Sequence, residues 1–404
     1  MTISVGIIKE GKTPSDQRVP LRPEHALLLS KKPFVSDVRI QKDARRCFSN
    51  EEYDEKGLTL TDDVSDCDVL MGVKEVPIDQ LIPHKTYFFF SHTIKEQPYN
   101  RPLLQAAIEK KIRLIDYEVL THKKGQRLIA FGRFAGMVGA HNAIWTYEQR
   151  KGILSLPRLH HLRDYEEAKS VYEKRALAPI KIVVTGGGRV ANGAVEVLKD
   201  MGAHQLDPET FLKIETDRAV FTQLDCSDYA ARKDGAEFDL DYFFKHPEEH
   251  ESIFEPYTKM ADVFINGIYW DNQAPRFFSP EDMRRDDFRI QVIADVTCDI
   301  APVASVPSTL RPSTIDDPVY GYDPKTEKEA APFQPECIDV MAVDNLPNEL
   351  PRDASTSFGE QFLEHIADEL QDPNSDILNR ATIAQNGNLG EHFRYLKSYL
   401  EGQA

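Results

Sequence analysis

The fold is decided by one stretch, Ile180-Lys181-Ile182-Val183-Val184-Thr185-Gly186-Gly187-Gly188-Arg189-Val190-Ala191-Asn192-Gly193-Ala194. A β-branched run of strand length stops at three glycines, and apolar residues then recur with helical spacing as far as Met201. Gly186, Gly188 and Ala191 fit the pattern G-x-G-x-x-[G/A], in which small residues let the backbone approach a pyrophosphate at a helix N-terminus. The stretch therefore predicts a strand, a turn and a helix that bind a dinucleotide; an ordinary strand-to-helix turn is the alternative.

A carboxylate about twenty residues after the glycines is the second part of such a site. Residues 203–206 are expected to be the second strand of the nucleotide fold, with Asp207 at its end. Its carboxylate would accept hydrogen bonds from ribose hydroxyls, which favours NAD over NADP; both cofactors stay open. Later strands are expected to end at Asn266 and at Asp295. The roughly fifty intervening polar residues before Ala261 predict an inserted helical excursion.

Composition limits the possible partners. The 404 residues exceed one typical core and predict two domains. A net charge of −17 argues against nucleic acid and against an anionic membrane surface. No apolar run reaches membrane-spanning length and the first residues enter a strand pattern directly, so we expect a cytoplasmic protein. Five scattered cysteines without a C-x-x-C pair predict reduced thiols, and we expect no metal site.

Polar residues follow three strand-like runs in the N-terminal part. Lys74 and Glu75 follow residues 69–73, His92 follows an aromatic run that starts at Thr86, and Glu118 follows residues 113–116. Ligands of open α/β sheets bind outside the carboxyl ends of the strands, so we expect Lys74, His92 and Glu118 to converge. Each of them alone would be read as a solvated loop residue.

The domains follow from the same patterns. Helical regions 358–370 and 391–400 are expected to pack on the N-terminal part, which makes the first domain discontinuous. We predict an α/β protein with two Rossmann-like domains and a cleft between them. The substrate and catalytic domain would comprise residues 1–135 and 346–404, and the dinucleotide-binding Rossmann domain residues 136–345.

Two further segments carry structural expectations. Gly136 and Gly139 lie in a mostly apolar stretch and predict a tightly packed linking helix over residues 134–147. The proline-rich residues 302–335 are expected to form a long ordered loop, because aromatic residues such as Tyr320 give it material to pack.

Several segments resemble one group of enzymes. They are Lys9-Glu10, Arg18, Val69 to Glu75, Lys85 to Lys95, Arg113 to Glu118, Ala130-Phe131-Gly132, Asn266-Gly267-Ile268-Tyr269-Trp270 and Val343 to Pro347. In these the chain resembles the lysine–2-oxoglutarate reductase half of aminoadipic semialdehyde synthase and the single-domain, lysine-forming saccharopine dehydrogenases, within the alanine dehydrogenase and transhydrogenase superfamily. The resemblance covers essentially the whole chain. Residues 85–95 and 266–270 mark the lysine branch, whereas the Arg18 segment and the glycine loop are shared across the superfamily.

The resemblance implies an NAD(P)-dependent oxidoreductase. The ε-amine of L-lysine would condense with 2-oxoglutarate, and a reduced nicotinamide cofactor, NADH or NADPH, would reduce the imine to saccharopine in a reversible reaction. Position by position, the resemblance assigns Lys74 and His92 as the acid–base pair and Glu75 and Glu118 as the carboxylates around it. It assigns Arg18 and Arg127 as the substrate-binding arginines. The matched cofactor-binding positions are Gly186, Gly188, Arg189, Val190, Asp207, Asn266 and Asp295. The chain departs from its relatives after Asp299, where Ile300-Ala301-Pro302 replaces a segment that often carries glycines.

This chemistry needs groups that exchange protons near neutrality. Histidine does so unperturbed, whereas Lys74 would need its pKa lowered by burial or by a neighbouring cation. Either Lys74 or His92 could serve each proton transfer. Planar guanidinium groups such as those of Arg18 and Arg127 suit the carboxylates of both substrates.

Two other functions fit parts of the sequence. An alanine dehydrogenase would share the arginine, lysine and histidine but use ammonia and pyruvate; the excursion after Asp207 and the segment 266–270 favour the lysine branch. A non-catalytic nucleotide-binding sensor would keep the fold, but the joint presence of Lys74, His92 and Arg18 speaks against it. The expected partners are small molecules, with product passing to a separate downstream saccharopine dehydrogenase. The direction of flux and the oligomeric state stay open.

Overall fold

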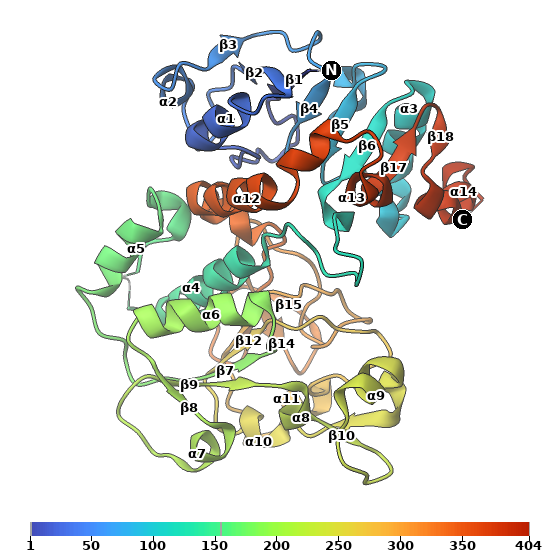
Figure 1. Ribbon diagram of the computed structural model, residues 1–404. Helices are drawn as coiled ribbons and strands as arrows, with labels where there is room; N and C mark the ends of the chain where they lie inside the picture. Colours follow the sequence, from blue (N-terminus) through green and yellow to red (C-terminus); the bar gives the residue numbers. More distant parts are fainter. Residues whose placement is uncertain (1, 154–155, 404) are drawn as a thin grey trace. The chain divides into compact units, whose positions relative to one another are not determined.

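The computed structural model describes residues 2–153 and 156–403, and the chain forms two compact units (Figure 1). Unit 1 comprises Met1–Phe131 and Pro351–Ala404, and unit 2 comprises Gly132–Leu350. The first unit is therefore discontinuous, because the C-terminal residues return to it. The boundaries lie at residues 131 and 351, whereas the sequence patterns predict them at residues 135 and 346.

Within the described residues of unit 1, eight strands form one sheet in the order β18-β17-β6-β5-β4-β1-β2-β3. Their bounds are β1 (Ile3–Ile7), β2 (Val35–Gln41), β3 (Thr59–Thr61), β4 (Val69–Met71), β5 (Thr86–Phe89), β6 (Arg113–Asp116), β17 (Thr382–Gln385) and β18 (Asn388–Leu389). β1 to β6 pair in parallel, whereas β17 pairs antiparallel with β6. The central strands read as continuous apolar runs because both faces of a parallel sheet are covered.

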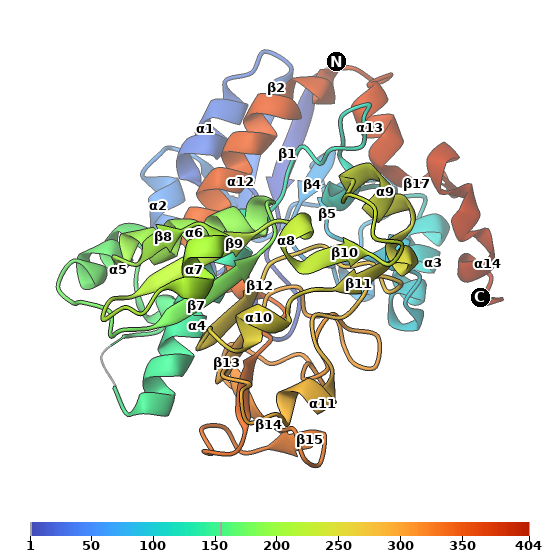
Figure 2. The ribbon, with the colours of Figure 1, turned by 90° about the horizontal axis from the view of Figure 1, so that it is seen from below.

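Helices cover both faces of this sheet. They are α1 (Pro23–Ser30), α2 (Asn50–Asp54), α3 (Arg101–Glu109), α12 (Pro351–His365), α13 (Asp376–Ala381) and α14 (Lys397–Leu400), with short 3-10 turns η2 (Thr93–Lys95) and η4 (Tyr117–Val119) among others. Figure 2 shows α1 and α12 side by side. They pack closely because Gly359 of α12 leaves room for the ring of His25. One apolar cluster includes Phe358 and Phe362 of α12, and a second includes Leu104 of α3.

The described part of unit 2 also has eight strands in one sheet, in the order β15-β14-β16-β13-β12-β7-β9-β8. Their bounds are β7 (Lys181–Thr185), β8 (His204–Leu206), β9 (Val220–Leu224), β12 (Val263–Asn266), β13 (Val292–Asp295), β14 (Val319–Asp323), β15 (Lys328–Ala330) and β16 (Ile338–Met341); β10 (Ala230–Arg232) and β11 (His250–Ser252) form a separate ribbon. The proline-rich segment expected to be a loop thus contributes two strands, β14 and β15, of which β15 is the edge strand. The expected helical excursion contains β9 and the ribbon as well as short helices.

The helices of unit 2 include a pair in direct backbone contact. The helices are α4 (Gly132–Lys151), α5 (Tyr165–Tyr172), α6 (Arg189–Asp200), α7 (Pro208–Lys213), α8 (Cys226–Tyr229), α9 (Leu240–Lys245), α10 (Glu255–Thr258) and α11 (Pro280–Met283). α4 and α6 lie side by side (Figure 1). A Cβ atom at Gly136 of α4 would overlap the carbonyl oxygen of Val190, and one at Gly193 of α6 would overlap that of Arg133. α4 is the tightly packed helix that its glycines predict. No helix in the described chain is both long and apolar enough to cross a membrane.

The second strand of the nucleotide fold is not the one expected. β9 pairs in parallel with β7 from Lys181↔Val220 to Thr185↔Leu224, and β8 pairs only with the far side of β9. β8 is short and exposes His204 and Gln205, so it suits the sheet edge. The largely buried β9 suits the position beside β7.

Candidate active site and cofactor site

Three neighbouring strands of unit 1 carry the predicted catalytic side chains at their carboxyl ends. β4, β5 and β6 are adjacent and parallel. They are followed by Lys74 and Glu75, by His92, and by Glu118 respectively. The structure brings Glu75 and His92 into contact, and it places Lys74 next to them in the chain.

Lys74 has the environment of a lysine that can lose its proton near neutrality. Its side chain is half-buried, and among the described residues no hydrogen bond or ion pair reaches its amine. Burial, followed by the positive charge of Arg18, lowers the pKa of Lys74 from 10.5 to about 8. Asp16 and Glu75 act in the opposite direction and do not outweigh these effects. Both conditions that the chemistry sets for Lys74 are present.

Glu75 holds His92 in one orientation. Nδ1 of His92 lies 2.6 Å from Oε1 of Glu75, and Nζ of Lys12 donates to Oε2 of the same carboxylate at 3.0 Å. Burial alone would raise the pKa of Glu75, but the hydrogen bond and charge of His92 prevail and lower it to about 2. His92 adopts a left-handed backbone with φ of 55°, and its ring stacks on Phe90 at 6.4 Å between centroids. With Nδ1 engaged, Nε2 is the nitrogen available for proton exchange.

Glu118 and Arg127 form a pair. Nη2 of Arg127 donates to Oε1 of Glu118 at 2.5 Å, and Nζ of Lys95 lies 4.0 Å from Oε2. Oε2 is buried and accepts no hydrogen bond from the described residues. Buried polar atoms rarely stay without a partner. A substrate ammonium group would supply the missing donor, so the predicted substrate role of Glu118 fits its geometry better than that of the exposed Arg127 does.

Arg18 is engaged by a residue that the sequence analysis missed. Its side chain is 4% exposed, and its Nε and Nη2 donate to the two carboxylate oxygens of Asp16 at 2.9 and 2.6 Å. The guanidinium also lies 4.3 Å from the ring centroid of Phe131. The predicted binding of a substrate carboxylate by Arg18 would have to take place beside Asp16 or displace it. Asp16 could have been suspected only from its charge two positions before Arg18, which is no specific signal.

In unit 2, the glycine loop joins β7 to α6 as its sequence predicts. Gly186 has a φ of 104°, in the left-handed region that favours glycine, and its N–H donates to the carbonyl oxygen of Leu224 at 2.9 Å. Gly188 is the N-cap of α6 and makes no side-chain cap hydrogen bond. A Cβ atom at Gly187 would lie 2.9 Å from Oδ1 of Asp225, which follows β9 directly. The carboxylate beside the loop is therefore Asp225.

The first turn of α6 carries the other two residues predicted at the phosphate turn. Arg189 is exposed and Val190 is half-buried. The loop before them is held from β9, because Nε2 of Gln223 donates to the carbonyl oxygen of Gly186 at 2.9 Å. The N-terminus of α6 thus follows a fixed loop and has no side-chain cap, which suits a phosphate-binding turn.

Asp207 does not lie at the end of the strand next to β7. It is exposed and caps α7, where its Oδ1 accepts a hydrogen bond from the backbone N–H of Thr210 at 2.9 Å. Hydrogen bonds from the side chain and then from the backbone of Thr210 lower the pKa of Asp207. Because β9 separates β8 from β7, the structure contradicts the expected placement of Asp207 beside the glycine loop.

Asn266 and Asp295 form a buried network. Nδ2 of Asn266 donates to Oδ1 of Asp295 at 2.9 Å and to Ser305 at 2.8 Å, and its Oδ1 accepts from Thr185 at 3.1 Å. Oδ2 of Asp295 accepts from Thr309 at 2.6 Å, and burial raises the pKa of Asp295 to about 6. Both side chains are 0% exposed. They join the ends of β12 and β13, and their predicted contact with the cofactor stays a prediction.

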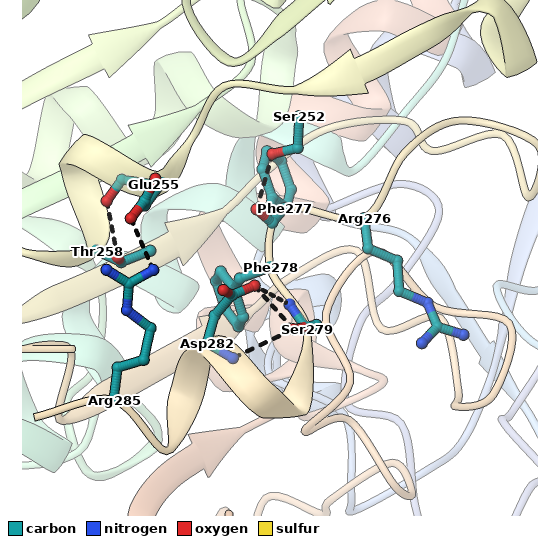
Figure 3. Close-up of a pocket in the computed structure, with 9 residues that line it drawn as sticks. All are labelled: Ser252, Glu255, Thr258, Arg276, Phe277, Phe278, Ser279, Asp282 and Arg285. Atoms are coloured by element: carbon teal, nitrogen blue, oxygen red, sulfur yellow. Dashed lines mark hydrogen bonds and ion pairs between the residues drawn. The ribbon is translucent and has the colours of Figure 1, made fainter.

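A separate cavity of about 360 Å³ in unit 2 shares no lining residue with the glycine loop (Figure 3). Its lining residues are Ser252, Glu255, Thr258, Arg276, Phe277, Phe278, Ser279, Asp282 and Arg285. Many of its polar groups are paired with each other: Ser252 with the carbonyl of Phe277, and Arg285 with Glu255.

A possible metal cluster is weak. In the described chain, ligand atoms of His246, Glu248 and Glu249 lie within 4.8 Å of one another. Both glutamates are exposed, and exposed acidic groups commonly occur without an ion. We therefore assign no metal centre to them.

The chain is similar to several known proteins. Residues 6–138 match the family model "Alanine dehydrogenase/PNT, N-terminal domain". The chain is 30% identical over 440 residues to alpha-aminoadipic semialdehyde synthase of Arabidopsis thaliana, an alignment that covers 97% of this chain and 41% of that protein. The mitochondrial synthase of Mus musculus is 28% identical, with 96% and 47% covered. The chain thus spans less than half the length of these synthases.

A shorter relative is matched almost end to end. Saccharopine dehydrogenase [NAD(+), L-lysine-forming] of Neurospora crassa is 26% identical, with 91% of each chain covered. Among solved structures, an L-alanine dehydrogenase has a TM-score of 0.67 at 16% identity over 100% of both chains. A transhydrogenase from Sinorhizobium meliloti has a TM-score of 0.57 at 13% identity, covering 96% and 99%. The expected resemblance and the two Rossmann-like α/β domains are confirmed.

Proposed function

We propose that the protein is a lysine–2-oxoglutarate reductase, a saccharopine dehydrogenase of the L-lysine-forming type. It would condense L-lysine with 2-oxoglutarate and reduce the imine to saccharopine, reversibly. The observation that carries the proposal is a lysine amine with its pKa lowered to about 8, at Lys74, which feels the charge of Glu75 in the close pair of His92 and Glu75. The names of the Arabidopsis and Neurospora relatives support this choice of reaction.

Lys74 and His92 divide the proton transfers. Neutral Lys74 accepts a proton from the ε-ammonium group of the substrate, which frees the amine to attack the keto carbon of 2-oxoglutarate. His92, held through Nδ1 by Glu75, delivers a proton from Nε2 to the carbinolamine oxygen, which leaves as water. The reverse assignment of the two residues is the alternative, and the pH dependence of variants can distinguish the two.

The remaining residues of unit 1 bind the substrates. Oε2 of Glu118, which accepts no hydrogen bond from the described residues, receives the substrate ammonium group before deprotonation. Arg18 and Arg127 face substrate carboxylates, with Asp16 turning the guanidinium of Arg18. In this proposal unit 1 is the substrate and catalytic domain, unit 2 is the dinucleotide-binding domain, and the cleft between them stays a prediction.

Unit 2 fits a nicotinamide cofactor, and we favour NAD. The N-terminus of α6 would hold the pyrophosphate, and the exposed carboxylate of Asp225 would accept hydrogen bonds from the ribose hydroxyls. When bound, the reduced cofactor supplies the hydride for the imine. Asp225→Ala should weaken NADH binding by about tenfold or more, measured by fluorescence titration. Asp207→Ala is the matched control; equal weakening by both variants would refute the choice of Asp225.

The deciding experiment measures oxidation of the reduced cofactor by the purified chain. Lysine plus 2-oxoglutarate is run beside ammonia plus pyruvate, each with NADH and with NADPH. Oxidation that requires both lysine and 2-oxoglutarate supports the proposal. Activity with ammonia and pyruvate alone would move the protein to the alanine dehydrogenase reaction, and cofactor binding without any turnover would favour a sensor.

Location and product transfer stay predictions. We expect a cytoplasmic location, whereas the name of the relative from Mus musculus describes that protein as mitochondrial. Transfer of saccharopine to a separate downstream dehydrogenase is testable by adding such an enzyme and following the second oxidation.

A further inference from the structure

The hydrogen-bond ladder between β1 and β4 is continued by a side chain. The backbone ladder runs as far as Ile8, whose N–H donates to the carbonyl oxygen of Met71 at 3.0 Å. Beyond this point the carboxylate of Glu10 is the acceptor. Oε1 accepts from the N–H of Val73 at 2.6 Å, and Oε2 accepts from the N–H of Lys74 at 2.9 Å.

Glu10 is itself held in place. It is 7% exposed, and its backbone carbonyl oxygen accepts a hydrogen bond from Nη2 of Arg45 at 2.5 Å. A Cβ atom at Gly72 would lie 3.3 Å from Oε1, so the absence of a side chain there leaves room for the carboxylate. Burial raises the pKa of Glu10 to about 7, while its two backbone hydrogen bonds favour the charged form. The charged and titratable groups that act on it or feel its charge are Asp16, Arg18, Arg45 and Tyr117.

We propose that Glu10 is a positioning residue for Lys74, which fixes where the Lys74 side chain leaves the strand end. The inference rests on the proposed acid–base function of Lys74. The Lys74 amine has no hydrogen-bond partner among the described residues, so its place is set by its backbone and by packing. A small displacement of that backbone would move the amine relative to Arg18 and to the buried surroundings.

A carboxylate can accept both of these hydrogen bonds at once. Each oxygen of Glu10 accepts one backbone N–H. In Glu10→Gln an NH2 group replaces one carboxylate oxygen, while the side-chain volume is almost unchanged. One hydrogen bond is then lost, and the NH2 group faces a backbone N–H, which is also a donor. In Glu10→Asp the carboxylate stays but is one methylene shorter.

The first test does not depend on enzymatic activity. Acetylation of Lys74 by acetic anhydride is followed by mass spectrometry between about pH 6 and about pH 10, because only the neutral amine reacts. The wild type is compared with Glu10→Gln and with Glu55→Gln, a matched control at an exposed position. The wild type and the control should show an inflection near the lowered pKa of about 8. In Glu10→Gln the inflection should move up toward that of an ordinary lysine. An inflection that stays in place overturns the inference.

The second test measures turnover with lysine and 2-oxoglutarate. Glu10→Gln should lower kcat on the order of tenfold to a hundredfold and leave the KM of the reduced cofactor unchanged, and Glu10→Asp should restore part of the loss. An active wild type matched by an equally active Glu10→Gln variant would overturn the inference. An inactive wild type with a shifted Lys74 inflection in Glu10→Gln would refute the proposed function and leave the positioning role standing.

A second variant covers a failure of Glu10→Gln to fold. Gly72→Ala keeps the charge of Glu10 but places a methyl group 3.3 Å from its Oε1 and 3.0 Å from Cδ1 of Ile8. Ile8 and the carboxylate must then give by a few tenths of an ångström, which strains the hydrogen bonds to the amides of Val73 and Lys74. Gly72→Ala should shift the Lys74 inflection in the same direction, and an unshifted inflection in this folded variant would count against Glu10.

Discussion

Replacing Lys74 with methionine should stabilise the protein and abolish turnover. The half-buried amine has its pKa lowered from 10.5 to about 8, because burial and Arg18 disfavour its ammonium form. At about 1.4 kcal/mol for each pKa unit, this corresponds to about 3 kcal/mol of destabilisation at pH 7. Methionine has a similar length and carries no charge, so the variant should gain approximately this free energy of unfolding.

The gain has a definite pH dependence. Below pH 8 the lysine is protonated in both the folded and the unfolded chain, so the folded state bears the full cost of the charge. Above pH 8 the folded protein releases the proton while the unfolded chain keeps it up to pH 10.5, and the wild type recovers stability. The advantage of Lys74→Met should therefore fall from about 3 kcal/mol at pH 7 to about half that at pH 9.5.

Urea unfolding at these two pH values measures the effect. Lys31→Met, at an exposed position, is the matched control and should change the free energy of unfolding by less than about 0.5 kcal/mol at either pH. In the lysine and 2-oxoglutarate assay Lys74→Met should lose turnover by about a hundredfold or more. A variant less stable than the wild type at pH 7, or a gain independent of pH, would refute the reasoning.

Two further predictions concern packing and the catalytic pair. Gly193→Ala should lower the free energy of unfolding by about 1–3 kcal/mol, because its methyl group would overlap the backbone of Arg133; an unchanged melting temperature by calorimetry would show that the helices can separate freely. Glu75→Gln should lose turnover and about 2 kcal/mol of stability at pH 7, allowing for solvent screening. The pKa of Glu75 is lowered to about 2 by His92, so this difference should be present above pH 4.5 and fade as the pH falls toward 2; an equal loss at pH 7 and pH 3 in urea unfolding would contradict the pairing.

The parts of the site that sequence predicts are those coded by local pattern. β7, the glycine turn and α6 follow from one uninterrupted stretch in which strand, turn and helix signals agree. Lys74, His92 and Glu118 follow from the rule that parallel strands end at a common edge, which needs only the strand ends to be located.

The order of strands in the sheet of unit 2 is not local. Spacing from the glycine loop points to Asp207, whereas Asp225 lies beside the loop because β9, which follows β8 in sequence, occupies the place next to β7. Two candidate strands compete for that place, and the more buried one takes it. The largely apolar residues 219–224 were the available signal, but they stood inside a stretch interpreted as a helical excursion.

The partners of charged side chains are also beyond local pattern. Glu118 and Arg127 were each predicted as substrate contacts, yet they bind one another. Asn266 and Asp295 lie on neighbouring strands and satisfy each other in the core. A sequence shows which charges exist, whereas burial and neighbouring strands decide which charge each of them meets.

The contact of α4 with α6 makes the two helices one mechanical part. At Gly136 and Gly193 the backbones meet without side chains between them, so no rotamer change can absorb a small sliding movement. A tilt of α4 must then be carried into α6 without loss. The glycine loop is joined to the first turn of α6. The direction of its N–H groups therefore depends on the position of α4, the helix with which unit 2 begins.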